Sequence, residues 1–450
     1  MSKDPEPETE LDTWQEIAAY LNISVREAQY REKNDGMPVH RMPGKKSRVR
    51  AYRSELDEWK ARVSRASGGP SAVRDLHSRN QRLSRRALLG SVVGAGSVLA
   101  AGAAWVFRPR TAVPVRAGLV GNTLYAWDES GRELWKHSFS ETIRDRRPDN
   151  GMLASPDRQV QITDLHGDGS KQVILVAGLG EGTGQPTRDE LYCFSSSGKL
   201  LWQYRPDVAV TFGGTRFAGP WYLMDMLVAP NGRQKVIWLA LAHWNWMPGA
   251  VLALDPQGGA SVRFVNAGHI YALCRVSNGG RNYILAGGVN NEYASAALAV
   301  FTEDAVPSSS PQSRGSRFDA SDGPKGQPHR YFLLPPSELT MASDKPYNMV
   351  DRIDETNDEF LVQTNEITGQ EHATAIYRFS KRIEPLDVAF DDSWAARHRR
   401  LQKEGKLSHD LDDCPQLSRV TAVRQWDRES AWTTLNVPPS KGVRPNAFLR

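Results

Sequence analysis

The chain has 450 residues, which is enough for more than one domain, because a single hydrophobic core rarely grows to that size. Its formal net charge is +5, but residues 1–86 hold 18 basic and 13 acidic side chains, so the rest is balanced. This charge distribution gives most of the chain no need of a polyanionic partner and predicts that any contact with phosphates or anionic lipid lies in the first fifth. The three cysteines, Cys193, Cys274 and Cys414, show no C-x-x-C spacing, and they therefore predict neither a zinc site nor a disulfide framework.

The N-terminal segment contains signals for three short helices and a hairpin. Thr13 and Glu16 form a capping box that predicts an amphipathic helix over about 14–21, and Ser24 with Glu27 forms a second box shortly afterwards. The basic stretch 43–47 is flanked by extended segments at 37–42 and 48–52, which predicts a hairpin or wing. A third helix is expected from 55 to about 63, with Leu56 and Trp59 on its inward face.

The sequences TWQEIAAYLNISVREAQYREK (13–33) and GMPVHRMPGKKSRVRAYRSELDEWK (36–60) resemble the winged helix-turn-helix of excisionases and MerR-like regulators, over about residues 9–62. The resemblance implies a small α+β domain that binds duplex DNA through its second helix and its wing. Glu27, Tyr30 and Arg31 depart from the family pattern, so a version of the domain that contacts protein stays open. The residues expected to contact DNA are Ser24, Arg26, Gln29, Tyr30, Arg41, Lys45, Lys46 and Arg48.

Residues 87–107 form an uncharged stretch that is long enough to cross a bilayer as one helix, and a basic, Ser/Gly-rich linker over 64–86 precedes it. Five arginines before the stretch and three after it predict a cytoplasmic N-terminus. The sequence at 84–89 also resembles a twin-arginine export signal, and ordinary positive-inside arginines are the alternative. Gly90 and Gly94 have the small-x-x-x-small spacing of paired membrane helices, which predicts a homodimer.

The remaining chain, 108–450, carries an internal repeat. LYAWDESGRELW at 124–135 recurs as LYCFSSSGKLLW at 191–202, and a weaker copy, VLALDPQG, lies at 251–258. Strands that end in a glycine hairpin and recur at about 60 residues are typical of propeller blades. The segment resembles the FG-GAP and quinoprotein-like families, which implies an all-β propeller with a loop insertion near 305–328.

Calcium binding is a known property of FG-GAP loops, and Asp164 and Asp168 fit that pattern. His166 replaces the middle carboxylate, however, and Gln172 stands where an acidic ligand usually closes the loop. Since calcium needs several oxygen ligands, we expect a plain turn here and no cofactor.

Together these features predict a multidomain chain with a winged helix-turn-helix, a single transmembrane helix and an all-β propeller. The domains are expected at 1–8 (disordered tail), 9–63, 64–86, 87–107 and 108–450. The predicted function is a membrane-tethered transcription regulator of the inner membrane, whose extracytoplasmic propeller senses a ligand or docks a protein. An envelope adaptor whose winged helix no longer binds DNA is the alternative. No enzymatic constellation stands out.

Overall fold

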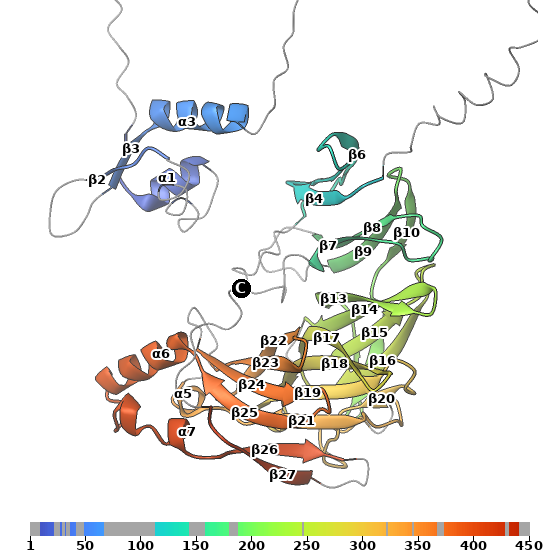
Figure 1. Cartoon of the computed structure of the whole chain (residues 1–450), viewed down its shortest axis with the longest axis vertical. Coiled ribbons are helices and arrows are strands. Elements are labelled where there is room, and N and C mark those ends of the chain that lie inside the picture. The colour runs from blue at the N-terminus through green and yellow to red at the C-terminus, as the bar shows by residue number, and fades with distance from the viewer. Residues whose placement is uncertain are drawn as a thin grey trace, which may run out of the picture. The chain divides into compact units, whose positions relative to one another are not determined.

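The structure is a computed structural model, and it describes residues 10–21, 28, 32, 37–41, 49–66, 113–143, 158–179, 188–244, 247–320, 323–343, 346–366, 373–427 and 432–440. The chain divides into two compact units, residues 1–101 and residues 102–450 (Figure 1).

The first unit packs two helices on a small sheet of order β1-β3-β2. The predicted capping box is confirmed: the Glu16 N–H donates to the Thr13 hydroxyl at 3.2 Å, and the Glu16 carboxylate accepts from the Asp12 N–H at 2.8 Å. The third predicted helix is also present, with Leu56 and Trp59 buried. The elements are β1 (Glu10–Leu11), α1 (Trp14–Leu21), β2 (His40–Arg41), β3 (Val49–Tyr52) and α3 (Arg53–Ala66).

The resemblance to a winged helix-turn-helix is not supported by the structure. Of the expected second helix, only residues 28 and 32 are described, and the expected wing tip at 42–48 lies outside the described residues. The described part of this unit therefore shows a three-stranded sheet with two helices, in which no winged helix-turn-helix is evident.

The second unit consists of mainly antiparallel sheets, in which most neighbouring strands follow one another in the chain. Sheet I contains β4 (Arg116–Val120), β5 (Thr123–Trp127) and β6 (Glu133–Ser138). Sheet II contains β7 (Val160–Thr163), β8 (Gln172–Leu179), β9 (Arg188–Ser195) and β10 (Leu200–Tyr204), and a separate hairpin of β11 (Ala209–Phe212) and β12 (Thr215–Ala218) follows it.

The next three sheets continue the same arrangement. Sheet III contains β13 (Trp221–Asn231), β14 (Gln234–His243), β15 (Gly249–Leu254), β16 (Ala260–Asn266) and, parallel to β16, β20 (Ser308–Ser309). Sheet IV contains β17 (Ile270–Asn278), β18 (Arg281–Asn290), β19 (Ser295–Thr302), β21 (Arg330–Leu334), β26 (Thr421–Trp426) and β27 (Trp432–Val437). Sheet V contains β22 (Met349–Glu355), β23 (Glu359–Asn365), β24 (Thr374–Ser380) and β25 (Pro385–Phe390).

Successive sheets pack face to face, because each strand alternates its apolar side chains between two faces. Separate apolar clusters fill the spaces between sheets I and II, II and III, III and IV, and IV and V. The first strands of neighbouring sheets also lie together, since β4 contacts β7, β13 contacts β17 and β17 contacts β22.

The repeat detected in the sequence marks the joints between these sheets. Trp135 on β6 donates its indole N–H to the Ser196 carbonyl at 2.9 Å, and a Cβ on Gly198 would lie only 2.7 Å from its ring. Trp202 on β10 makes the same contact with the Pro256 carbonyl at 2.9 Å, beside Gly258. The last residue of one copy therefore docks on the glycine turn of the next copy.

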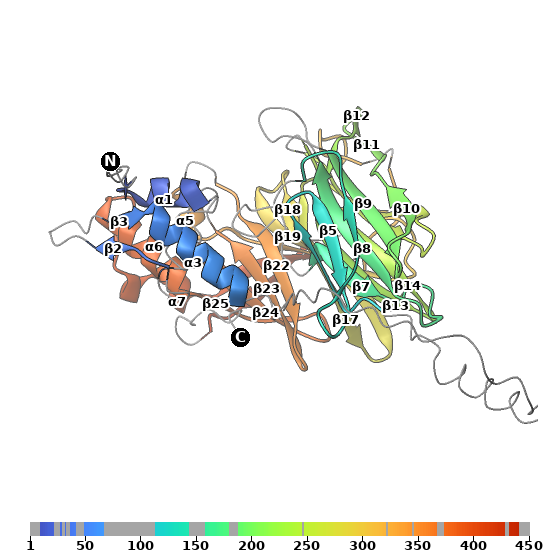
Figure 2. The ribbon, with the colours of Figure 1, turned by 90° about the horizontal axis from the view of Figure 1, so that it is seen from above.

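A helical segment connects sheet V back to sheet IV. It contains α6 (Asp392–Lys403), the 3-10 turn η3 (Leu411–Asp413) and α7 (Pro415–Ser418), and it packs with α5 (Glu338–Met341), which precedes sheet V. Figures 1 and 2 both show these helices gathered at one end of the sheets. After α7 the chain adds β26 and β27 to the outer edge of sheet IV.

The predicted fold class is wrong as a whole. The described chain is mostly β, with strands in seven separate sheets and five short α-helices, and the expected combination of a winged helix-turn-helix, a membrane helix and an all-β propeller is not supported.

The expected membrane helix at 87–107 lies outside the described residues. No helix in the described ranges is both long and apolar enough to cross a bilayer. The predicted assignment as a single-pass protein of the inner membrane is therefore not supported.

Candidate metal centre

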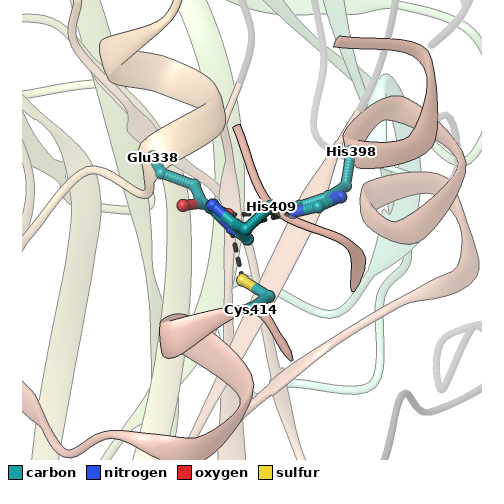
Figure 3. Close-up of side chains that lie close together, drawn as sticks. All are labelled: Glu338, His398, His409 and Cys414. Carbon is teal, nitrogen blue, oxygen red and sulfur yellow. Dashed lines mark hydrogen bonds and ion pairs between the residues drawn. The ribbon is translucent and has the colours of Figure 1, made fainter. Parts of the chain in front are cut away.

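Four side chains with metal-binding atoms converge where the helical segment meets α5. Glu338, His398, His409 and Cys414 point toward one another, and their ligand atoms all lie within 4.8 Å of one another (Figure 3). Two lie in helices and two in connecting segments: Glu338 begins α5, His398 lies on α6, His409 follows α6, and Cys414 lies between η3 and α7.

The local sequence explains why His409 returns to His398. The Asp391 carboxylate starts α6 by accepting the Trp394 N–H at 2.9 Å, which directs the buried face of the helix, including His398, inward. Gly405 ends the helix in a left-handed conformation at φ +72°. The N–H groups of Gly405 and Lys406 donate to carbonyls of the last helical turn, a Schellman motif that reverses the chain.

Glu338 is held from the opposite side by a buried carboxylate. Glu366 is fully buried, and it accepts the backbone N–H of Ser337 at 2.7 Å and the hydroxyl of Thr340 at 3.0 Å. The Asn348 amide donates to its other oxygen at 3.0 Å. These bonds fix both ends of the short helix α5, so the backbone position from which the Glu338 side chain extends is also fixed.

The separations match a four-ligand site for a small cation. The Nε2 atoms of His398 and His409 lie 3.3 Å apart, and they lie 3.2 and 3.3 Å from Oε1 of Glu338. A tetrahedral zinc ion with bonds of about 2.0–2.3 Å places its ligand atoms about 3.3–3.7 Å apart. The Cys414 thiol donates to the same Oε1 at 2.9 Å, so binding requires only a small movement of the sulfur.

Burial sets the protonation state of two of these groups. Burial lowers the pKa of His398, which favours the neutral imidazole that can coordinate a metal. Burial and the neighbouring Glu338 raise the pKa of the Cys414 thiol to about 12, so without a cation the sulfur keeps its proton. A bound divalent cation reverses this preference, since a coordinated thiol loses its proton.

The site is closed rather than open. The side chains of His398 and Cys414 are buried, while those of Glu338 and His409 are 20% and 26% exposed. Four protein ligands in a site of this kind leave no position for substrate, which is the arrangement of structural zinc sites.

The structure describes almost none of the residues predicted to contact DNA. All of them except Arg41 lie outside the described residues, as do Gly90 and Gly94, and for Arg41 only the backbone in β2 is described. Their roles therefore stay predictions.

The loop with Asp164 and Asp168 is held by hydrogen bonds. The Asp164 carboxylate accepts the N–H groups of Gly167 and Gly169 at 2.7 and 2.8 Å, and Asp168 accepts the Ser170 N–H at 2.8 Å. The bonds from Gly169 and Gly167 lower the pKa of Asp164, and those from the hydroxyl and N–H of Ser170 lower the pKa of Asp168. Gln172 closes the loop by accepting the Leu165 N–H at 2.8 Å.

The metal cluster was missed in the sequence because its ligands are far apart. Glu338 lies 60 positions before His398, and only the helix, glycine stop and loop at 391–414 bring the other three together. The available signal was the presence of two histidines and a cysteine within 17 residues, which does not match the paired-cysteine pattern of a zinc site.

Comparisons with known proteins identify no family. No family model matches the chain, and no curated protein matches it. Among solved structures, the GH43 β-1,3-galactosidase BT3683 with galactodeoxynojirimycin is 10% identical at a TM-score of 0.28, covering 61% of this chain and 87% of that one. A hypothetical protein from Leishmania major is 6% identical at a TM-score of 0.27, covering 64% and 87%. Scores this low carry no argument about activity.

Proposed function

We propose that this chain binds one zinc ion through Glu338, His398, His409 and Cys414. The observation that carries the proposal is the convergence of one sulfur, two imidazole nitrogens and one carboxylate oxygen within 4.8 Å. This mixed set suits zinc, which accepts sulfur, nitrogen and oxygen ligands in tetrahedral geometry. Calcium and magnesium prefer oxygen ligands alone.

The ion would fasten the helical segment to the end of the sheets. Glu338 lies between β21 and β22, whereas the other three ligands lie between β25 and β26. Binding would therefore join the two connections between sheets IV and V. A ligand that binds only the folded state stabilises it by about 4 kcal/mol at a thousandfold excess over its dissociation constant.

A hydrogen-bonded cluster without metal is the competing explanation. In that case the Cys414 thiol and both imidazoles share one acceptor oxygen, Oε1 of Glu338. Such an arrangement cannot satisfy both His398 and His409 fully, because their two facing Nε2 atoms can share only one proton.

The test measures zinc in the full chain after purification without chelator. We expect one zinc per chain by elemental analysis, and a visible d–d spectrum with a thiolate charge-transfer band when cobalt replaces zinc. Cys414→Ala should lose the metal and the charge-transfer band. Cys274→Ala is the matched control, because Cys274 is also buried but is not one of the four residues of the candidate metal centre.

Thermal unfolding distinguishes a structural ion from an incidental one. A strong chelator should lower the unfolding temperature of the unmodified chain and of Cys274→Ala, but not that of Cys414→Ala. Metal content near zero in the unmodified chain, with no uptake of added zinc, would leave the hydrogen-bonded cluster as the correct explanation.

The predicted role of residues 9–63 in DNA binding stays a prediction, as does the alternative of an adaptor that no longer binds DNA. Neither supports the zinc proposal or depends on it.

A further inference from the structure

Sheets I, II and III each carry the same four-residue turn between two neighbouring strands, which we call the docking turn. The three docking turns are residues 128–131, 195–198 and 255–258. In each, the glycine N–H donates to the carbonyl of the first turn residue at 3.0 Å, and the glycine φ lies between +82° and +87°. The second and third turns receive Trp135 and Trp202, whose indoles donate to the second turn residue.

The next joint keeps the hydrogen bond but changes the donor. The turn that follows β19 begins at Thr302, and the Ala305 N–H donates to the Thr302 carbonyl at 3.0 Å. Arg263 from sheet III donates to the carbonyl of Glu303, the second residue of that turn, at 3.1 Å. The second-residue carbonyl is thus bonded by a side chain of the preceding sheet at three successive joints.

The first docking turn has the same backbone but no described side chain on it. A Cβ built on Gly131 meets nothing within 4 Å, whereas one on Gly198 or Gly258 would lie 2.7 or 3.0 Å from an indole. Glu129, the residue whose carbonyl corresponds to those of Ser196 and Pro256, is exposed.

The described residues also cover the face of sheet I beside this turn only in part. Tyr125 and Trp127 correspond in the repeat to Tyr192 and Phe194, which are 7% and 0% exposed because they pack against sheet I. Tyr125 and Trp127 are only half-buried and belong to none of the apolar clusters described here. The Arg116 guanidinium lies 4.5 Å above the Trp127 ring.

The described sheets of this chain supply no donor for this turn. In sheet V the corresponding turn ends at Ile383, and the position equivalent to Trp135 is Asp387, which accepts from Arg378 at 3.0 Å. An aspartate cannot donate to a carbonyl. A second copy would present Trp135 and Trp202 already docked on its own turns.

We propose that the outer face of sheet I, at Tyr125, Trp127 and the docking turn 128–131, is a binding surface for a partner protein that presents a tryptophan from an edge strand. The indole would lie on Gly131 and donate its N–H to the Glu129 carbonyl, as Trp135 and Trp202 do at the two following turns. An aromatic anchor in such a position is the typical source of affinity in a protein interface.

The test uses a probe taken from the chain itself. A labelled hairpin peptide of residues 188–204, carrying Cys193→Ala, presents Trp202 on a strand, and its binding to the full chain is measured by fluorescence anisotropy. The blocking variant is Gly131→Asn, since asparagine tolerates a left-handed backbone and its side chain would occupy the place of the indole. Gly121→Asn is the matched control, because Gly121 lies in the other turn of sheet I at φ +56° with equally open space.

We expect the peptide to bind the unmodified chain and Gly121→Asn alike, and to lose at least about tenfold in affinity with Gly131→Asn or when its own Trp202 is alanine. No binding at millimolar peptide, or equal binding by Gly131→Asn, would overturn the proposal. Sedimentation of the unmodified chain as a dimer that Gly131→Asn dissociates would also overturn it, because the occupant would then be a second copy.

Discussion

Comparing alanine substitutions at Gly131 and Gly198 tests the docking of Trp135, because both substitutions carry the same cost for a left-handed backbone. Their φ angles are +82° and +84°, so replacing either with alanine costs about 1–2 kcal/mol for the left-handed conformation. Gly131→Ala meets nothing within 4 Å, and it should cost no more than this. Gly198→Ala places a methyl group 2.7 Å from two ring atoms of Trp135, so the indole must move.

Displacing the indole adds two further costs. The hydrogen bond from Trp135 to the Ser196 carbonyl contributes about 1 kcal/mol, and forced overpacking costs about 1–3 kcal/mol. Gly198→Ala should therefore lower the free energy of unfolding by about 2–4 kcal/mol more than Gly131→Ala. Urea unfolding followed by tryptophan fluorescence measures the difference. Equal losses in the two variants would refute the docking of Trp135 on Gly198.

Three further perturbations follow from other contacts. Arg263→Met keeps the apolar stem but removes the bonds to the Glu303 and Ala305 carbonyls, and it should cost about 2 kcal/mol in urea unfolding; no loss would show that the donor at this joint is dispensable. Burial raises the pKa of Asp351 to about 7, so the unmodified chain should lose stability relative to Asp351→Asn as the pH rises from 4 to 7. The expected loss is about 2 kcal/mol, which is half of the full linkage value because the side chain keeps some access to solvent. Parallel urea midpoints of the two proteins across that pH range would contradict this. Glu366→Gln should weaken the hydrogen bonds that hold α5 and therefore speed the release of zinc to a chelator, while the zinc content of the untreated protein stays the same. An unaltered release rate would show that Glu366 does not position Glu338.

The sequence predicted features that depend on residues close together in the chain. The capping box at Thr13, the helix with Leu56 and Trp59 inward, and the strand-turn pattern of the repeat all follow from local spacing, and the structure contains each of them. Local spacing also correctly suggested that Asp164 starts a turn, since its carboxylate caps the backbone of the next five residues.

The features that were missed depend on residues far apart in the chain. The repeat predicted a tryptophan at the end of each copy but not its partner, because the acceptor for Trp135 lies 61 residues later. Glu338 is separated in the chain from the other three residues of the candidate metal centre by the whole of sheet V. The fold class inferred by resemblance was wrong for a related reason: short sequence patterns predict single elements, whereas the fold depends on how the strands are arranged in sheets.

The late addition of β26 to β21 has a consequence for the protein while it is being made. On the ribosome, β21 can join β19 as soon as residues 330–334 emerge, but its other edge is paired only when residues 421–437 follow. At about 5–20 residues per second this takes several seconds, during which the nascent chain carries an open strand whose Tyr331, Phe332 and Leu333 are buried in the finished molecule. A translation pause between these segments would lengthen that interval, and chaperones that bind extended apolar segments are expected to contact β21 during it.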